Sequence, residues 1–148
     1  PNVTLRTTLI TGFPGETEEQ FEELCEFVKE IRFERLGCFA YSPEEGTPAE
    51  KFEDQVPLKD RERRAEIIME EQMIISDSFN EAALDSEVEV VCEVFDRDAE
   101  CYYGRSQADA PEIDGKIFFL SEDKVRVGEY VKVKIDDTMD YDLIGSKM

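Results

Sequence analysis

Histidine is missing from this 148-residue sequence, and so is the side chain that most often serves as general base or metal ligand near neutral pH. The four cysteines, Cys25, Cys38, Cys92 and Cys101, include no C-x-x-C pair. Iron–sulfur and zinc sites usually draw two ligands from one tight turn. The sequence therefore predicts neither a metal site nor a catalytic residue in this chain. Apolar surroundings predict that Cys25, Cys38 and Cys92 are small buried side chains.

Basic residues are also scarce, with 17 lysines and arginines against 37 acidic residues and a formal net charge of -20. A charge of this sign repels nucleic acid and attracts basic partners. No run of about 18 apolar residues occurs, which predicts no membrane span. The chain begins at Pro1 and not at a methionine, so we expect it to be a fragment. It does not begin with the charged segment and apolar run of a secretory signal peptide, and we expect a cytoplasmic protein.

The first forty residues have the pattern of a strand, a helix and a second strand. Residues 5–11 are β-branched and apolar, and residues 35–41 form a second such run. Between them, Thr17 and Gln20 have the spacing of a capping box, which begins an amphipathic helix. We expect the two strands to be parallel and joined by a right-handed crossover.

A long charged helix and a β-rich tail follow. The helix covers about residues 58–84, and its wide apolar pattern predicts packing on two sides. After a boundary near residues 85–86, five short strand patterns occur within some sixty residues, which predicts a small closed barrel. These patterns lie at residues 88–95, 102–103, 117–120, 130–135 and 143–145.

Two loops are candidates for a ligand site because each follows a strand of the same parallel sheet. The first is the turn from Gly12 to Gly15, and the second begins at Tyr41. Ligands in α/β folds bind outside the carboxyl ends of the strands, where glycine lets the backbone approach them. Arg6, in the first strand, is a candidate for holding a cofactor carboxylate. Alternatively, the glycines of the first loop only shape its turn, and the second loop is a rigid loop that packs against the sheet. Arg6 would then pair with a structural acid.

The loop at residues 104–115 is rich in carboxylates. It carries Asp109, Glu112 and Asp114 and ends in a turn-forming Asp-Gly pair. Such a loop is suited to binding a basic partner. Arg105, close to Tyr102 and Tyr103, is compatible with a nucleic-acid stacking patch, but the surrounding carboxylates argue against one, and ordinary barrel packing is the alternative.

Together these motifs resemble the methylthiotransferase family of radical S-adenosylmethionine enzymes. The resemblance is carried by residues 5–17, by residues 39–49 and by the tail, whose residues 141–145 match the usual close of a TRAM domain. It implies an α/β part followed by an all-β part. Residues 1–85 are then the terminal βαβ part of a partial (β/α) barrel with its connecting helix, and residues 86–148 are a TRAM (OB-like) barrel of five strands.

Residues 104–105 and 108–115 resemble the branch of the family that methylthiolates the β-carbon of an aspartate in ribosomal protein uS12. The tail carries 16 acidic and 8 basic residues, a net charge of -8, which suits a basic ribosomal protein or the small ribosomal subunit better than tRNA. The alternatives are the sister branch, which modifies adenosine in tRNA, and a non-enzymatic acidic adaptor that binds proteins.

The resemblance also implies cofactors and site residues. S-adenosylmethionine would lie near Arg6, Gly12, Gly15 and Tyr41, and the substrate would dock on a second set comprising Arg105, Asp109, Glu112 and Asp114. The family uses two [4Fe–4S] clusters held by cysteine motifs that this sequence lacks. Their ligands are expected outside this chain, and the chain alone is expected to be inactive.

Overall fold

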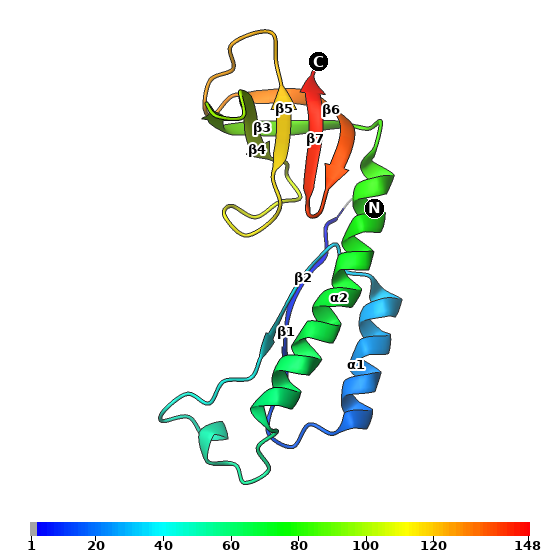
Figure 1. Ribbon diagram of the computed structural model, residues 1–148, viewed down its shortest axis with the longest axis vertical. Coiled ribbons are helices and arrows are strands. Elements are labelled where there is room, and N and C mark those ends of the chain that lie inside the picture. Colours follow the sequence, from blue (N-terminus) through cyan, green and yellow to red (C-terminus); the bar gives the residue numbers. More distant parts are fainter. Residues whose placement is uncertain (1–2) are drawn as a thin grey trace. The chain divides into compact units, whose positions relative to one another are not determined.

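The computed structural model describes residues 3–148, which fall into two compact units, Thr4–Ile75 and Ser76–Met148, the second of which also includes Val3. Figure 1 shows the elements of both units, and the long helix contributes residues to each of them. Within the described residues, no helix is both long and apolar enough to cross a membrane.

The first unit contains two parallel strands and two helices. Strand β1 (Arg6–Thr11) pairs with β2 (Arg35–Ala40), in the register Arg6 with Arg35 and Thr11 with Ala40. Helix α1 (Glu18–Ile31) lies between them in the chain and begins at the predicted capping box, in which the Thr17 hydroxyl accepts from the Gln20 amide. The parallel βαβ arrangement predicted from the sequence is confirmed.

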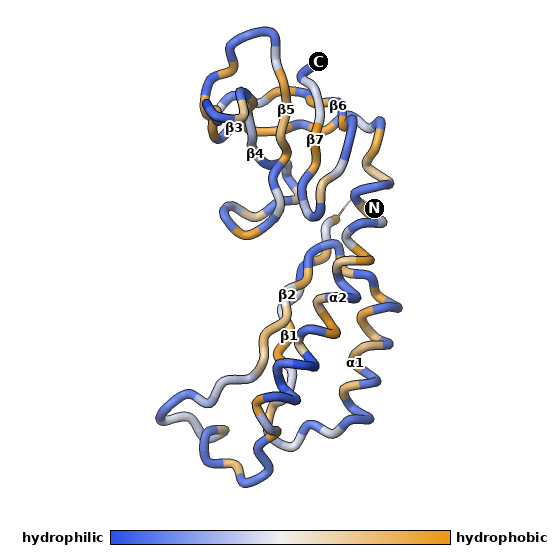
Figure 2. The backbone as a smooth tube through the Cα atoms, in the orientation of Figure 1, coloured by the Kyte–Doolittle hydropathy of each residue, from blue (hydrophilic) through white to orange (hydrophobic). Residues whose placement is uncertain are grey.

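One face of this two-stranded sheet remains open. Both helices of the unit lie on the same side of the sheet in Figure 1. On the other face, Ile10 and Phe39 are register partners with 56% and 64% of their surfaces exposed. In Figure 2 the two strands carry both hydrophilic and apolar colours, and the exposed apolar pair shows that the sheet is not buried on both faces.

Helix α2 (Leu58–Ala83) follows a loop that contains the short 3₁₀ helix η1 (Ala49–Lys51). Within the first unit, its buried positions recur at intervals of three and four residues and form one stripe. The prediction of packing on two sides was wrong there, because apolar residues such as Met73 and Ile74 are exposed while polar ones are buried. The stripe consists of Arg61, Arg64, Ile68, Gln72 and Ile75.

The second unit closes into the predicted five-stranded barrel. Its strands are β3 (Glu87–Asp96), β4 (Cys101–Arg105), β5 (Ile117–Leu120), β6 (Tyr130–Met139) and β7 (Asp142–Lys147). They follow one another around the barrel in the order β3-β4-β5-β7-β6, all neighbours being antiparallel except β5 and β7. The α/β part followed by a small closed barrel is therefore confirmed as the fold class.

The barrel core explains this closure. On β6, Val131, Val133 and Ile135 alternate with exposed residues, so the period-2 pattern places every second side chain inside. They pack with Val90, Cys92, Ile117, Phe119 and Val125. Phe119 also stacks on Tyr102, with ring centroids 5.5 Å apart, and thereby joins β5 to β4.

Candidate functional site

The two loops at the carboxyl ends of β1 and β2 lie side by side. The amide of Tyr41 donates to the carbonyl of Thr11 over 2.8 Å, and the ring centroids of Phe13 and Tyr41 are 5.2 Å apart. The amide of Gly15 donates to the carbonyl of Asp54 over 2.9 Å. The structure therefore brings three predicted cofactor-site residues, Gly12, Gly15 and Tyr41, into one cluster of loops.

Gly12 has a structural reason to be glycine. Its φ of +72° lies in the left-handed region, and a side chain there would collide with Arg61. Its amide donates to Glu16 Oε1 over 2.8 Å, and the Gly15 amide is likewise engaged with Asp54. Because both amides are engaged within the protein, neither is available to a ligand in this conformation.

Arg61 ties the start of α2 to both loops. Its side chain donates to the carbonyl of Val56 over 2.5 Å, to the carbonyl of Tyr41 over 3.1 Å and to Gln55 Oε1 over 3.3 Å. The Arg61 carbonyl in turn accepts from the Thr11 hydroxyl. A buried guanidinium is tolerated here because these oxygens satisfy its donors.

Arg64, one turn further along α2, holds the glycine turn through carboxylates. Its guanidinium contacts Glu16 Oε1 at 2.6 Å and Glu18 Oε2 at 2.8 Å. Glu18 also pairs with the exposed Arg63 at 3.0 Å. Hydrogen bonds from Arg64, and then from Arg63, hold the pKa of the Glu18 carboxyl below its usual range.

Sequence reasoning missed Arg61 and Arg64 because it searched α2 for apolar periodicity. The available signal was their spacing of three residues, which places them on the same stripe as Ile68. The acceptors of these arginines come from residues as far as 48 positions away in the sequence. No local pattern reveals such partners.

Tyr41 is the predicted site residue with an unused polar group. Its side chain is buried, and its hydroxyl has no hydrogen-bond partner among the described residues. Arg61 lies over its ring, with 5.3 Å between the guanidinium carbon and the ring centroid. A buried hydroxyl without a partner costs free energy, so a further polar group that came within reach of it would be stabilised there.

Arg6 is not part of this cluster. It is the first residue of β1 and is exposed, whereas Gly12 follows the last residue of the same strand. At about 3.3 Å per residue, the five steps from Arg6 to Thr11 separate the two ends of the strand by roughly 16 Å. A role for Arg6 in cofactor binding stays a prediction that the geometry of this cluster does not support.

The acidic loop after β4 uses two of its carboxylates internally. Asp109 is buried and accepts from the amide and the hydroxyl of Ser106 at 2.9 and 2.7 Å. Asp114 accepts from the Ala110 amide at 2.6 Å. Both carboxylates stabilise the fold of the loop, so their predicted role in substrate docking is not favoured by the geometry.

Arg105 and Glu112 complete the predicted docking set. Arg105 forms an ion pair with Glu93 across the β3–β4 pair, with 2.8 Å between Nε and Oε1. Glu112 is exposed and lies in a turn, with a φ of 63° in the left-handed region. Of the three acidic residues in this set, only Glu112 is exposed, and its docking role stays a prediction.

The cysteines belong to no group of potential metal ligands within residues 3–148. In the described part of the chain, no three histidine, cysteine or acidic side chains are grouped so that they could hold a metal ion. Burial raises the pKa of all four thiols, that of Cys38 to about 11. Only Cys92 is fully buried, so the expectation of burial was wrong for Cys25 and Cys38, which are partly exposed.

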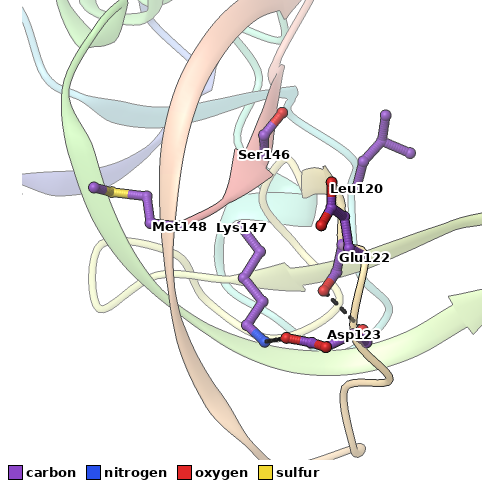
Figure 3. A pocket seen from close by; sticks show the side chains of 7 residues that line it. Leu120, Glu122, Asp123, Ser146, Lys147 and Met148 are labelled. Atoms are coloured by element: carbon purple, nitrogen blue, oxygen red, sulfur yellow. Dashed lines mark hydrogen bonds and ion pairs between the residues drawn. The ribbon is translucent and has the colours of Figure 1, made fainter.

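The barrel has a cavity of about 510 Å³ that contains none of the predicted site residues (Figure 3). It lies where β5 and β7 end, and the chain terminus Met148 and Leu120 contribute apolar walls. Lys147 and Asp123 form an ion pair across it at 3.7 Å. Since Lys147 already has this partner, the cavity has no free cationic site for an anion.

Comparison with known proteins connects this architecture to a family. A model described as TRAM domain matches residues 86–147. Relatives from Desulforamulus reducens and Caldanaerobacter subterraneus are 47% and 46% identical, each over 98% of this chain, and one from Clostridium botulinum is 46% identical over 97%. All three are named ribosomal protein uS12 methylthiotransferase RimO.

This chain spans about a third of the length of those relatives, 32–33% of each. Within that third, the match covers both units of the structure, including the loop cluster and the closed barrel. The resemblance predicted from the sequence is thus confirmed. Residues 86–147 match the model described as TRAM domain, and the chain is similar along nearly its whole length to about a third of each of the proteins named RimO.

Proposed function

We propose that this chain is the C-terminal part of a methylthiotransferase that acts on an aspartate β-carbon in ribosomal protein uS12. The observation that carries the proposal is the identity of 46–47% to relatives with that name, along 97–98% of the chain. The acidity of the chain supports it, because ribosomal proteins are basic and a net charge of -20 attracts basic partners. An enzyme with this substrate would work in the cytoplasm.

We assign residues 1–85 to the end of a partial (β/α) barrel with its connecting helix, and residues 86–148 to the TRAM domain. The open face of the β1–β2 sheet supports the first assignment. Its exposed pair, Ile10 and Phe39, is apolar, as expected of a sheet that is completed by further parts of a longer protein.

The residues present fit S-adenosylmethionine better than they fit an iron–sulfur cluster. No described group of side chains can hold a metal, so both [4Fe–4S] clusters would take their ligands from other parts of the protein. The Tyr41 hydroxyl has no hydrogen-bond partner among the described residues and would contact the cofactor once the loops around it move, because it is buried in this conformation. When bound, the cofactor and clusters would supply the radical, the sulfur and the methyl group. This chain would help to position the cofactor and would dock the substrate. Without the rest of the protein it would be inactive.

The test is the reaction of the full-length gene product with purified uS12 and, separately, with tRNA under reducing conditions with S-adenosylmethionine. Mass spectrometry then follows the gain of a methylthio group. Modification of an aspartate in uS12 is the expected result. Modification of tRNA adenosine would instead favour the sister branch, and modification of neither by a cluster-loaded protein would favour a non-enzymatic adaptor.

A further inference from the structure

The loop between β2 and α2 combines an aromatic pair with a strong excess of carboxylates. Phe13 and Phe52 lie edge to face, with ring centroids 6.3 Å apart, and each has 45% of its surface exposed. Phe13 also contacts Tyr41, so the three rings form one cluster anchored in the loops. We call Phe13, Phe52 and residues 44–54 the acidic aromatic platform.

The carboxylates of this platform are accessible. Residues 42–56 contain five acidic residues and one basic residue, Lys51, and all six are exposed. Among the residues that the structure describes, Glu44, Glu45 and Glu53 enter no ion pair. Among the same residues, these three carboxylates also accept no hydrogen bond, whereas those of Asp109 and Asp114 accept hydrogen bonds within their own loop, and within the platform Glu50 accepts one from the Gly46 amide.

Hydrogen bonds from Arg61, Gly15 and Gln55 hold the backbone of the platform in place. Arg61 donates to Gln55 and Val56, and the carbonyl of Asp54 accepts from Gly15. Gln55 additionally donates to the carbonyls of Ala49 and Phe52. Such bonds fix the backbone that carries the rings and carboxylates, which lowers the entropic cost of binding a partner.

We propose that the acidic aromatic platform docks a basic segment of the protein partner, with arginine or lysine side chains over the Phe13 and Phe52 rings and among the carboxylates. Aromatic faces attract such cations, and partly exposed aromatic anchors carry much of the energy of an interface. Unpaired carboxylates around them favour a basic partner and disfavour a phosphate backbone. The inference rests on the proposed function. It places substrate docking at the loops that follow β1 and β2, not at the acidic loop of residues 104–115.

The test is isothermal titration of purified uS12 into the 148-residue chain across a salt series. We expect Phe13→Ala/Phe52→Ala and Glu44→Gln/Glu45→Gln/Glu53→Gln each to raise Kd by about tenfold. The second variant should also flatten the dependence of Kd on salt. Circular dichroism of each variant verifies that it is folded.

Two control variants remove the same residue types, and the same number of charges, from positions outside the platform. Phe27→Ala/Phe95→Ala removes rings with 45% and 44% exposure, and Glu22→Gln/Glu23→Gln/Glu30→Gln removes three exposed charges from α1. We expect both controls to stay within about twofold of the unmodified chain. Equal weakening by platform and control variants would overturn the platform while leaving the proposed function intact. Absence of uS12 binding by the unmodified chain would also overturn it, and the modification assay would judge the function separately.

Discussion

The guanidinium of Arg64 bridges two carboxylates of the β1–α1 connection, contacting Glu16 at 2.6 Å and Glu18 at 2.8 Å. Only 6% of the Arg64 side chain is exposed, against 41% for its neighbour Arg63. Through Glu16, which also accepts from the Gly12 amide, this arginine secures the glycine turn to α2. One side chain thus connects the helix to a loop of the candidate site.

Replacing Arg64 should therefore cost far more stability than replacing Arg63. Arg64→Ala leaves Glu16 partly buried without its cation, and we expect a loss of about 2–4 kcal/mol in the free energy of unfolding. Arg63→Ala removes an exposed pair, for which about 0.5 kcal/mol is expected. Urea denaturation followed by circular dichroism measures both, and equal losses would contradict the burial argument.

Glu18 should titrate at unusually low pH. Its carboxyl pKa is lowered from 4.5, first by the hydrogen bond from Arg64 and then by that from Arg63. A lowered folded-state pKa contributes stability above the ordinary value, and this is lost as the pH falls through the folded value. NMR titration of the Glu18 side chain should give a midpoint below 4.5. Arg64→Ala should raise that midpoint more than Arg63→Ala does.

Cys38 should be protected at mildly alkaline pH. Burial raises the pKa of its thiol from 9.0 to about 11, so the thiolate that reacts with iodoacetamide is scarce at pH 9. The unfolded chain loses this proton first, so the associated stability is present below pH 9 and is lost as the pH rises towards 11. Alkylation mapped by mass spectrometry should show Cys38 reacting slowly at pH 9 in the folded chain and rapidly in urea. Similar rates in the two states would refute the assignment.

Gly104 is required by a close approach between barrel strands. A side chain there would collide with the carbonyl of Val91 on β3, next to the register shift between Cys92 and Val94. We expect Gly104→Ala to destabilise the barrel by about 1–3 kcal/mol, because the backbone must move to admit a methyl group. Gly37→Ala is the control, since its nearest new neighbour is the Phe39 ring at 3.9 Å. Thermal unfolding of both variants tests the difference.

The acidic loop contains a structural carboxylate, that of Asp109, and an accessible one, that of Glu112. Asp109→Ala removes two charge-assisted hydrogen bonds from Ser106 and should cost about 1.5–3 kcal/mol of stability. Glu112→Gln should leave stability within about 0.5 kcal/mol. Chemical denaturation of the two variants measures the contrast, and a large loss for Glu112→Gln would show that this residue is also structural.

The sequence predicted those parts of the fold that depend on local pattern. Thr17 and Gln20 marked the start of α1, and the strand patterns at residues 88–95 and 130–135 marked two strands of the barrel. Local pattern did not reveal the parallel pairing of β5 with β7 or the burial of Arg61, because both depend on residues distant in the chain. The same limit applies to the candidate site.

For the candidate site, charge and residue type were informative but incomplete. The glycine turn and Tyr41 were predicted to share one rim, and the structure brings them together. A carboxylate in a loop looks the same in the sequence whether it binds its own backbone, as Asp109 does, or faces solvent, as Glu53 does. Only three-dimensional contacts distinguish the two.

The burial of the cysteines affects how the charge of the chain depends on pH. With no histidine, and with thiol pKa values moved further above neutrality, the chain has no side chain whose ordinary pKa lies between about 5 and 8. Its electrostatic field is therefore nearly constant over the range of pH found in growing cells. The chain therefore contributes no histidine or thiolate switch to the attraction of a basic partner between pH 6 and pH 8, whereas ionic strength screens that attraction.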